Sequence, residues 1–228
     1  MQFREVTLAS SNLAAQKSFY GADMGLPLLV DNPDQLTVQA GLTRLTFLNA
    51  PDKPPHAYHI AFNVPENQLP AAGAWIELRT PVLASFSNPA KTVFEFLSWN
   101  AHSIYFKDGD SNIVEFIARH NLDNATDMPF TSNNILEVSE AGLPVEDVRR
   151  TATELEETLK LPVYDGKGSD MFAAVGDERG LFIVVPIGHP WLPTDSTSAI
   201  PMPIQIATPD IPSDYSVADL PYNLKRSE

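Results

Sequence analysis

One charged residue stands inside an otherwise apolar run near the middle of the chain. Residues 113–117 read IVEFI, and they place Glu115 among four side chains typical of a protein core. An ionised carboxylate on a buried strand is costly unless it is paired with a cation or bound to a metal ion. Two interpretations are therefore open. Glu115 either forms an ion pair with Arg44, Arg79 or Lys107, or it belongs to a metal or substrate site.

The composition restricts what such a site could contain. The chain has no cysteine, which excludes disulfides, thiolate metal ligands and a cysteine nucleophile. Any metal must be held by histidine, carboxylates or other oxygen and nitrogen donors. The formal net charge of −14 repels phosphate backbones, so we expect no nucleic-acid partner.

Length and hydropathy are those of an ordinary globular protein. The 228 residues are 43% hydrophobic and 19% charged. No run approaches the roughly 18 apolar residues that a membrane helix requires, so we expect no membrane partner. The first ten residues, MQFREVTLAS, show no basic segment followed by an apolar one. These features predict a cytoplasmic protein.

Hydrophobic periodicity predicts a repeated unit of one strand, one helix and about three further strands. The clearest helix is expected over 144–160, with Pro144 near its first turn and an apolar stripe along one face. The helix exits also match, because MGLPLLVDN at 24–32 resembles LKLPVYDGK at 159–167. Units are expected to open at the strands 3–10, 57–64 and 134–141, and a fourth, unfinished unit at 203–208.

The end of the second unit carries a motif that is typical of a known family. YFKDGDSNIVEF at 105–116 resembles the closing motif Y-F-x-D-P-D-G-N-x-x-E-F of the vicinal oxygen chelate superfamily. This family includes glyoxalase I, extradiol dioxygenases, fosfomycin-resistance enzymes and bleomycin-resistance proteins. SFYGADMGLPL at 18–28 also resembles the family's helix exit. Gly109 and Ser111 depart from the usual Pro and Gly, but both lie in the turn.

The resemblance covers roughly residues 1–188 and implies an α+β fold. In it, tandem βαβββ units form a curved mixed sheet, the cup, here with a third unit and part of a fourth. We expect residues 1–120 to hold two paired units that form the metal cup. Residues 133–210 would hold the third unit and the partial fourth, and 211–228 a C-terminal tail.

The resemblance also implies a ligand set, because the family's metal ligands lie on the first and last strands of each unit. Carried over by position, the ligands are Glu5, His59 and Glu115, with Thr46 at the fourth position. One imidazole and two carboxylates suit a divalent Mn, Zn or Fe(II) ion. For His59 the alternative is a hydrogen-bonded core histidine, and for Glu5 a solvated residue on an edge strand.

Further roles follow from the same comparison. Tyr105 would orient or protonate the substrate, unless it is only a cross-strand aromatic of the cup wall. His102 would be an acid–base residue, unless it is a solvent-facing histidine at a strand end. In the third unit Glu137 aligns with Glu5 and Gln205 with His59. No closing strand with a glutamate follows, so we interpret this as a vestigial second site that covers an edge or forms a homodimer interface.

The resemblance thus implies a metal-dependent enzyme of glyoxalase or dioxygenase type that acts on a small-molecule substrate through two vicinal oxygens. The alternative is a metal-free binding protein of the bleomycin-resistance type, which would sequester a small molecule in the cup.

Overall fold

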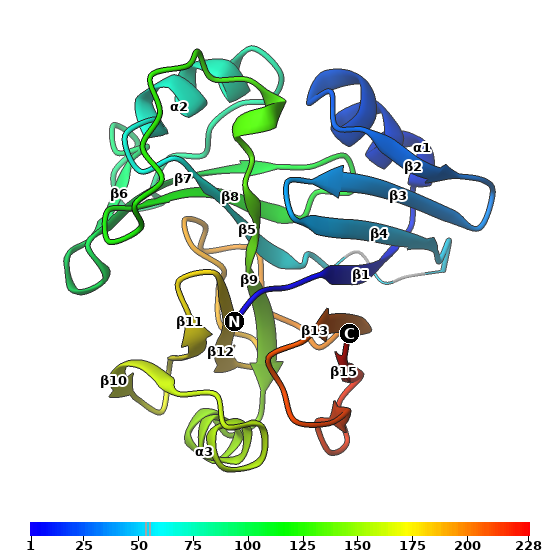
Figure 1. Ribbon diagram of the computed structural model, residues 1–228, viewed down its shortest axis with the longest axis vertical. Coiled ribbons are helices and arrows are strands. Elements are labelled where there is room, and N and C mark those ends of the chain that lie inside the picture. Colours follow the sequence, from blue (N-terminus) through cyan, green and yellow to red (C-terminus); the bar gives the residue numbers. More distant parts are fainter. Residues whose placement is uncertain (53, 55) are drawn as a thin grey trace.

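The computed structural model describes residues 1–52, 54 and 56–228 and contains three complete units and part of a fourth (Figure 1). The first unit comprises β1 (Glu5–Ser10), α1 (Leu13–Gln16, continued by a π-helical segment Lys17–Asp23), β2 (Leu28–Asp31), β3 (Gln35–Ala40) and β4 (Thr43–Asn49). The second comprises β5 (His59–Val64), α2 (Leu69–Glu77), β6 (Phe94–Phe96), β7 (Ala101–Lys107) and β8 (Ile113–Arg119). The third comprises β9 (Glu137–Val145), α3 (Val148–Leu159), β10 (Val163–Gly168), β11 (Ala173–Asp177) and β12 (Gly180–Pro186). The partial fourth has no helix and holds β13 (Ile204–Thr208), β14 (Tyr215–Ser216) and β15 (Tyr222–Arg226). The predicted α+β fold of tandem βαβββ units is confirmed.

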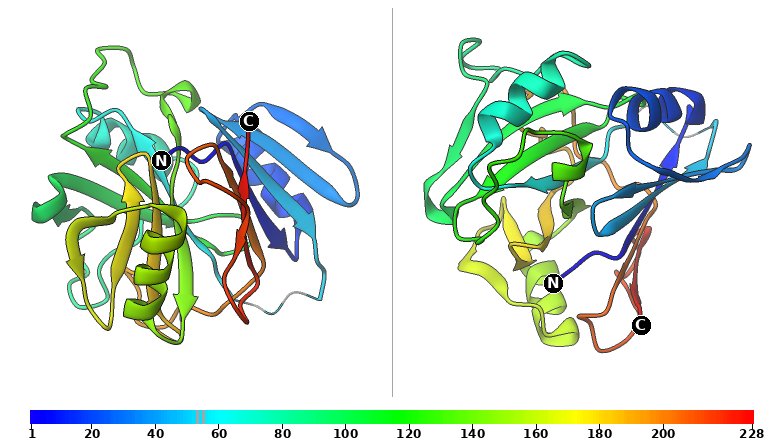
Figure 2. Two further views of the ribbon diagram at one scale, coloured as in Figure 1. Left: turned by 60° about the horizontal axis from the view of Figure 1, so that its bottom comes forward. Right: turned by 45° about the horizontal axis from the view of Figure 1, so that its top comes forward.

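The strands form two curved mixed sheets (Figure 2). The eight-stranded sheet has the order β10-β11-β12-β9-β5-β8-β7-β6, so it joins the second unit to the third. The seven-stranded sheet has the order β14-β15-β13-β1-β4-β3-β2, so it joins the first unit to the fourth. Within each unit the first and last strands are parallel, and two units meet through an antiparallel pair of first strands, β5 with β9 and β1 with β13.

The expected pairing of the first two units is therefore wrong. All six residues of β5 and all nine of β9 are buried, whereas β1 alternates between buried and half-buried residues. Strands that are covered on both faces belong at the centre of a sheet that is packed on both sides. Residues 211–228 are likewise no tail, because β14 and β15 complete the seven-stranded sheet. The expected boundaries at 120, 133 and 210 consequently do not separate the two sheets.

The helix α3 is shorter than the predicted helix over 144–160. It begins after Asp147, whose carboxylate accepts a hydrogen bond from the backbone N–H of Arg150 at 2.9 Å. Pro144 and Val145 instead extend β9, where they pair with β12. The helix buries one face against β10, β11 and β12, with Leu155 and Leu159 fully buried. In the part of the chain that the structure describes, no helix is long and apolar enough to cross a membrane.

The turn between β7 and β8 packs on the first helix. The buried carboxylate of Asp108 accepts hydrogen bonds from Gln16 (2.8 Å), Tyr20 (3.0 Å) and the side chain of Asn112 (2.8 Å). A Cβ on Gly109 would lie 2.4 Å from the carbonyl oxygen of Ala15. Gly109 is therefore required by the close approach of the turn to the helix backbone, which explains one of the two departures from the family motif.

Tyrosine hydroxyls connect the two sheets. Tyr222 of β15 donates to the carbonyl oxygen of Pro144 in β9 at 2.6 Å, and Tyr58 makes a second connection. Tyr58, directly before β5, donates its hydroxyl hydrogen to the carbonyl of Pro203 (2.6 Å) and accepts from the N–H of Ala9 (3.1 Å) in β1. Burial raises the pKa of Tyr58 from 10.0 to about 12. The pKa of Tyr58 is higher in the folded state than in the unfolded state. Its protonated hydroxyl therefore contributes to the free energy of unfolding below pH 10, and this contribution is lost as the pH rises to about 12.

We expect the free energy of unfolding to fall in both proteins as the pH rises from 10 to about 12. The wild type should lose up to about 3 kcal/mol more than Tyr58→Phe. At neutral pH the variant should be less stable by about 1 kcal/mol, because it loses the hydroxyl's hydrogen bonds. Urea denaturation of both proteins at several pH values measures the difference. Parallel pH dependence of the two proteins would contradict the assignment.

Candidate metal centre

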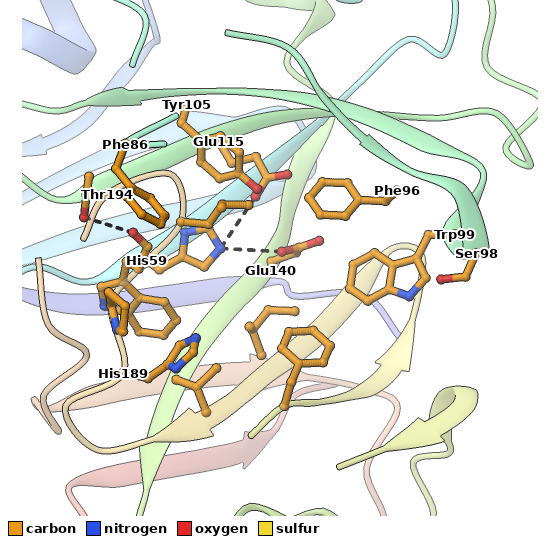
Figure 3. A pocket seen from close by; sticks show the side chains of 16 residues that line it. His59, Phe86, Phe96, Ser98, Trp99, Tyr105, Glu115, Glu140, His189 and Thr194 are labelled. Atoms are coloured by element: carbon orange, nitrogen blue, oxygen red, sulfur yellow. Dashed lines mark hydrogen bonds and ion pairs between the residues drawn. The ribbon is translucent and has the colours of Figure 1, made fainter. Parts of the chain in front are cut away.

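The eight-stranded sheet encloses a cavity of about 540 Å³ on its concave face (Figure 3). Aromatic side chains form much of its wall, among them Phe86, Phe96, Trp99 and Trp191. Trp191 packs closely against β9, where a Cβ on Gly142 would be 2.5 Å from its ring. The absence of a side chain at position 142 thus lets the indole close the cavity against the strand.

Three ionisable side chains converge at the floor of this cavity. The Nε2 atom of His59 lies 3.6 Å from a carboxylate oxygen of Glu115 and 3.6 Å from one of Glu140 (Figure 3). All three side chains are buried, and one ligand atom of each lies within 4.8 Å of the others. Among the described residues, these three side chains are the group of potential metal ligands that lie this close together.

Strand register explains why the three side chains meet. Ala61 of β5 lies opposite Glu115 of β8 on one side and opposite Glu140 of β9 on the other. His59 precedes Ala61 by two residues and so points to the same face of the sheet. The small side chain of Ala61 leaves the space between the two carboxylates open.

The hydrogen bonds of His59 determine which nitrogen is available. Its Nδ1 atom lies 3.3 Å from the carbonyl oxygen of Ile113, which can only accept a hydrogen bond. Nδ1 therefore carries the hydrogen in the neutral ring, and Nε2 presents its lone pair toward the two glutamates. A hydrogen bond from the other ring nitrogen to a backbone carbonyl is typical of a metal-binding histidine.

The two carboxylates have different electrostatic environments. Glu140 pairs with the fully buried Arg119, which also donates from Nε to the side-chain oxygen of Asn63 at 3.2 Å. Within the described residues no Lys or Arg pairs directly with Glu115. Burial raises the pKa of its carboxyl well above the usual value, with the charge of Glu140 adding to the shift. One arginine faces two carboxylates, so the centre has excess negative charge when both are ionised. A divalent cation would offset this charge, and the donor set of one imidazole and two carboxylates fits such an ion.

The structure brings three of the sequence-predicted residues to the cavity: His59, Glu115 and Tyr105. Tyr105 of β7 lies opposite Glu115 in register, and its ring centroid is 6.3 Å from that of His59. Burial raises the pKa of Tyr105 well above its usual value, and the charge of Glu115 raises it further. Their roles as ligands and substrate-orienting group stay predictions.

Two sequence-predicted residues lie elsewhere. Glu5 is on β1 of the seven-stranded sheet, where it is 31% exposed and pairs with Arg44 at 3.2 Å, so its expected place beside His59 is wrong. Thr46, the fourth expected position, is in the same sheet and hydrogen-bonds to Thr37 at 2.9 Å. His102 lies three positions before Tyr105 along β7, an odd number, so its side chain lies on the opposite face of the sheet. It lines a different cavity, against α2.

Glu140 is the residue that the sequence prediction missed. We aligned Glu137 with Glu5, but Glu137 instead accepts a hydrogen bond from Asn63 at 3.1 Å. The observed helix start identifies the right position, whereas the expected start at residue 144 leads back to Glu137. Glu140 precedes the capping Asp147 by seven residues, as Glu5 precedes the capping Asn12. An irregularity in the pairing of β5 with β9 then places Glu140 opposite Ala61. The third unit thus forms the cup together with the second unit and is not a vestigial second site.

Comparisons with known proteins point to the same architecture. No family model and no curated protein matches the sequence. Among solved structures, a Bacillus subtilis protein provisionally described as a dioxygenase is 18% identical, covers 91% of this chain and 70% of its own, and superimposes with a TM-score of 0.62. Glyoxalase I from Zea mays is 15% identical, covers 90% of this chain and 74% of its own, and has a TM-score of 0.52. At these identities the likeness concerns the fold. The chain therefore has the fold of the vicinal oxygen chelate superfamily, as its repeated units and closing motif predicted.

Proposed function

We propose that the protein is a metal-dependent enzyme that acts on a small substrate through two neighbouring oxygens. His59, Glu115 and Glu140 would hold the ion, and Mn(II), Zn(II) and Fe(II) all suit this donor set. The observation that carries the proposal is the convergence of three buried donors, one of them a carboxylate without a direct cationic partner, at the floor of an aromatic cavity.

The bound ion would supply Lewis-acid stabilisation of negative charge on the substrate oxygens. The chain's own residues supply orientation and the exclusion of water. Tyr105 is protonated at neutral pH, since the usual tyrosine pKa is 10.0 and burial raises it further, so its hydroxyl would serve as a hydrogen-bond donor to a substrate oxygen. The rings of Trp99 and Trp191 provide flat surfaces against which a planar ligand can stack.

The lining of the cavity favours an uncharged substrate. No Lys or Arg lines it among the described residues, and Glu115 and Glu140 are its acidic groups. Once the two carboxylates have offset the charge of the ion, an anionic ligand would meet no Lys or Arg side chain among the described lining residues. A neutral aromatic diol of the catechol type therefore fits the cavity better than an anionic thiol adduct or a phosphonate.

Metal-exchanged protein tests the proposal. Protein treated with EDTA is reloaded anaerobically with Fe(II), Mn(II) or Zn(II) and assayed for binding and turnover of neutral catechols and of methylglyoxal–thiol adducts. We expect activity on the neutral aromatic class with one of the metals, and its loss in Glu115→Gln. Glu5→Gln is the matched control and should remain active, because Glu5 lies in the other sheet.

The competing outcome is the metal-free binding protein. If EDTA-treated protein and Glu115→Gln bind the aromatic ligand as tightly as metal-loaded wild type and none of the panel reacts, the enzyme proposal is wrong. The aromatic cavity would then function as a sequestering site.

A further inference from the structure

A second group of histidines and carboxylates lies on the other face of the eight-stranded sheet. It contains His102 of β7, His120 directly after β8, Glu95 of β6 and Glu66 before α2. The first two line a cavity of about 610 Å³ between α2 and the sheet, as does Glu66. We propose that this group is a second metal site, in which His102 and Glu95 bind a divalent ion of the zinc, copper or nickel type.

A chain of hydrogen bonds fixes the orientation of the two imidazoles. Glu66 lies 2.9 Å from Nδ1 of His120, and a carboxylate accepts, so this nitrogen carries the hydrogen. Nε2 of His120 is then the acceptor for Nδ1 of His102, at 2.8 Å. Neutral His102 consequently has its free lone pair on Nε2.

That lone pair faces a second acceptor. Nε2 of His102 lies 3.7 Å from a carboxylate oxygen of Glu95, which is too long for a hydrogen bond. With zinc–nitrogen and zinc–oxygen bonds of about 2.1 Å, two ligands at a tetrahedral angle lie roughly 3.4 Å apart. The observed separation is close to this value, so a shared cation requires only a small movement of two side chains.

Strand pairing holds the two ligands next to each other. Glu95 and His102 are direct partners in the antiparallel pair of β6 and β7. Their side chains are 56% and 40% exposed, so the site is open to solvent and water can complete the coordination. His120 and Glu66 do not touch the ion but act as positioning residues, because they fix the tautomer of His102.

The surrounding charge also favours a cation. Besides Glu66, the cavity is lined by Glu77, and no Lys or Arg lines it within the described part of the chain. Apolar residues such as Leu69, Val93 and Ile104 form much of the remaining wall, together with the neutral polar residues Asn67 and Thr92. The site lies across the sheet from His59 and shares no residue with that centre, so it does not depend on the proposed function.

Zinc titration by isothermal calorimetry tests this site. In the double variant His59→Gln/Glu115→Gln, which removes two of the first centre's three ligands, we expect one equivalent of zinc to remain bound. Adding His102→Gln should weaken that binding at least tenfold, and Glu66→Gln should weaken it roughly tenfold through the tautomer of His102. His56→Gln is the matched control and should leave zinc binding unchanged, since His56 lines neither cavity.

A second readout does not depend on the first centre. With Cu(II) as the probe in the His59→Gln/Glu115→Gln background, electron paramagnetic resonance should show nitrogen coupling that disappears when His102→Gln is added and remains when His56→Gln is added. In the otherwise wild-type chain, His102→Gln should lower the zinc stoichiometry by one equivalent. Unchanged zinc stoichiometry and unchanged copper spectra in folded His102→Gln would overturn the proposal.

Discussion

Glu115→Gln should abolish the thermal stabilisation that a divalent ion gives to the EDTA-treated protein. At a concentration one hundred times its Kd, an ion that binds only the folded state stabilises it by about 2.7 kcal/mol. For a chain of this size this corresponds to a shift of roughly 5–10 °C in Tm. The amide of glutamine keeps the shape of the side chain but cannot supply a carboxylate ligand, so the shift should disappear. Scanning calorimetry with Mn(II), Zn(II) and Fe(II) measures it.

The pH dependence of this shift has a definite sign. Burial raises the pKa of Glu115 well above its usual value, so a proton and the metal compete for the same carboxylate. The stabilisation by the metal should therefore grow as the pH rises.

Two control variants separate this centre from other sites. Glu5→Gln should keep the full shift, and the zinc measurement is repeated in His102→Gln so that the second cavity does not contribute. A shift that persists in Glu115→Gln with every ion would refute the assignment of the centre.

In the metal-free protein, Glu→Gln should strongly lower stability at position 140 and should not lower it at position 115. Glu140→Gln leaves the fully buried Arg119 without its ionic partner, and breaking a buried pair in this way costs about 3–5 kcal/mol. Glu115→Gln removes a buried carboxylate that has no direct cationic partner, so stability at neutral pH should be unchanged or higher.

The effect of Glu115→Gln should depend on pH. Because the folded-state pKa of Glu115 is raised, its stability contribution is fully present below the usual value of 4.5 and is lost as the pH rises through the folded-state value. Any gain from Glu115→Gln should therefore vanish below pH 4.5. Urea denaturation of both variants at neutral and acidic pH measures this, and equal destabilisation by the two changes would contradict the charge assignment.

The sequence predicted the repeated units because hydrophobic periodicity and the 105–116 motif are local signals. It did not predict which units pair, since any first strand of this kind can pair with any other. The uninterrupted burial of β5 and β9 decided the pairing, and that burial depends on tertiary contacts.

The site was predicted only in part, because some of its residues follow from local signals and one depends on the pairing of two units. Glu115 and His59 lie on regular strands of one unit, where position along the motif translates directly into position in space. Glu140 comes from a strand with irregular pairing in another unit, so counting along the chain from Glu137 failed. His102 was misplaced by a simpler error, because the alternation of side chains along β7 already separates it from Tyr105.

The nested order of the units affects how the chain can assemble. Every strand of the eight-stranded sheet comes from residues 59–186, whereas the seven-stranded sheet joins β1 to β13, nearly two hundred residues later. Closing so long a loop is entropically slow, so the inner segment should collapse first during synthesis. Until β13 emerges from the ribosome, one edge of β1 lacks its native partner and is exposed to pairing with other chains.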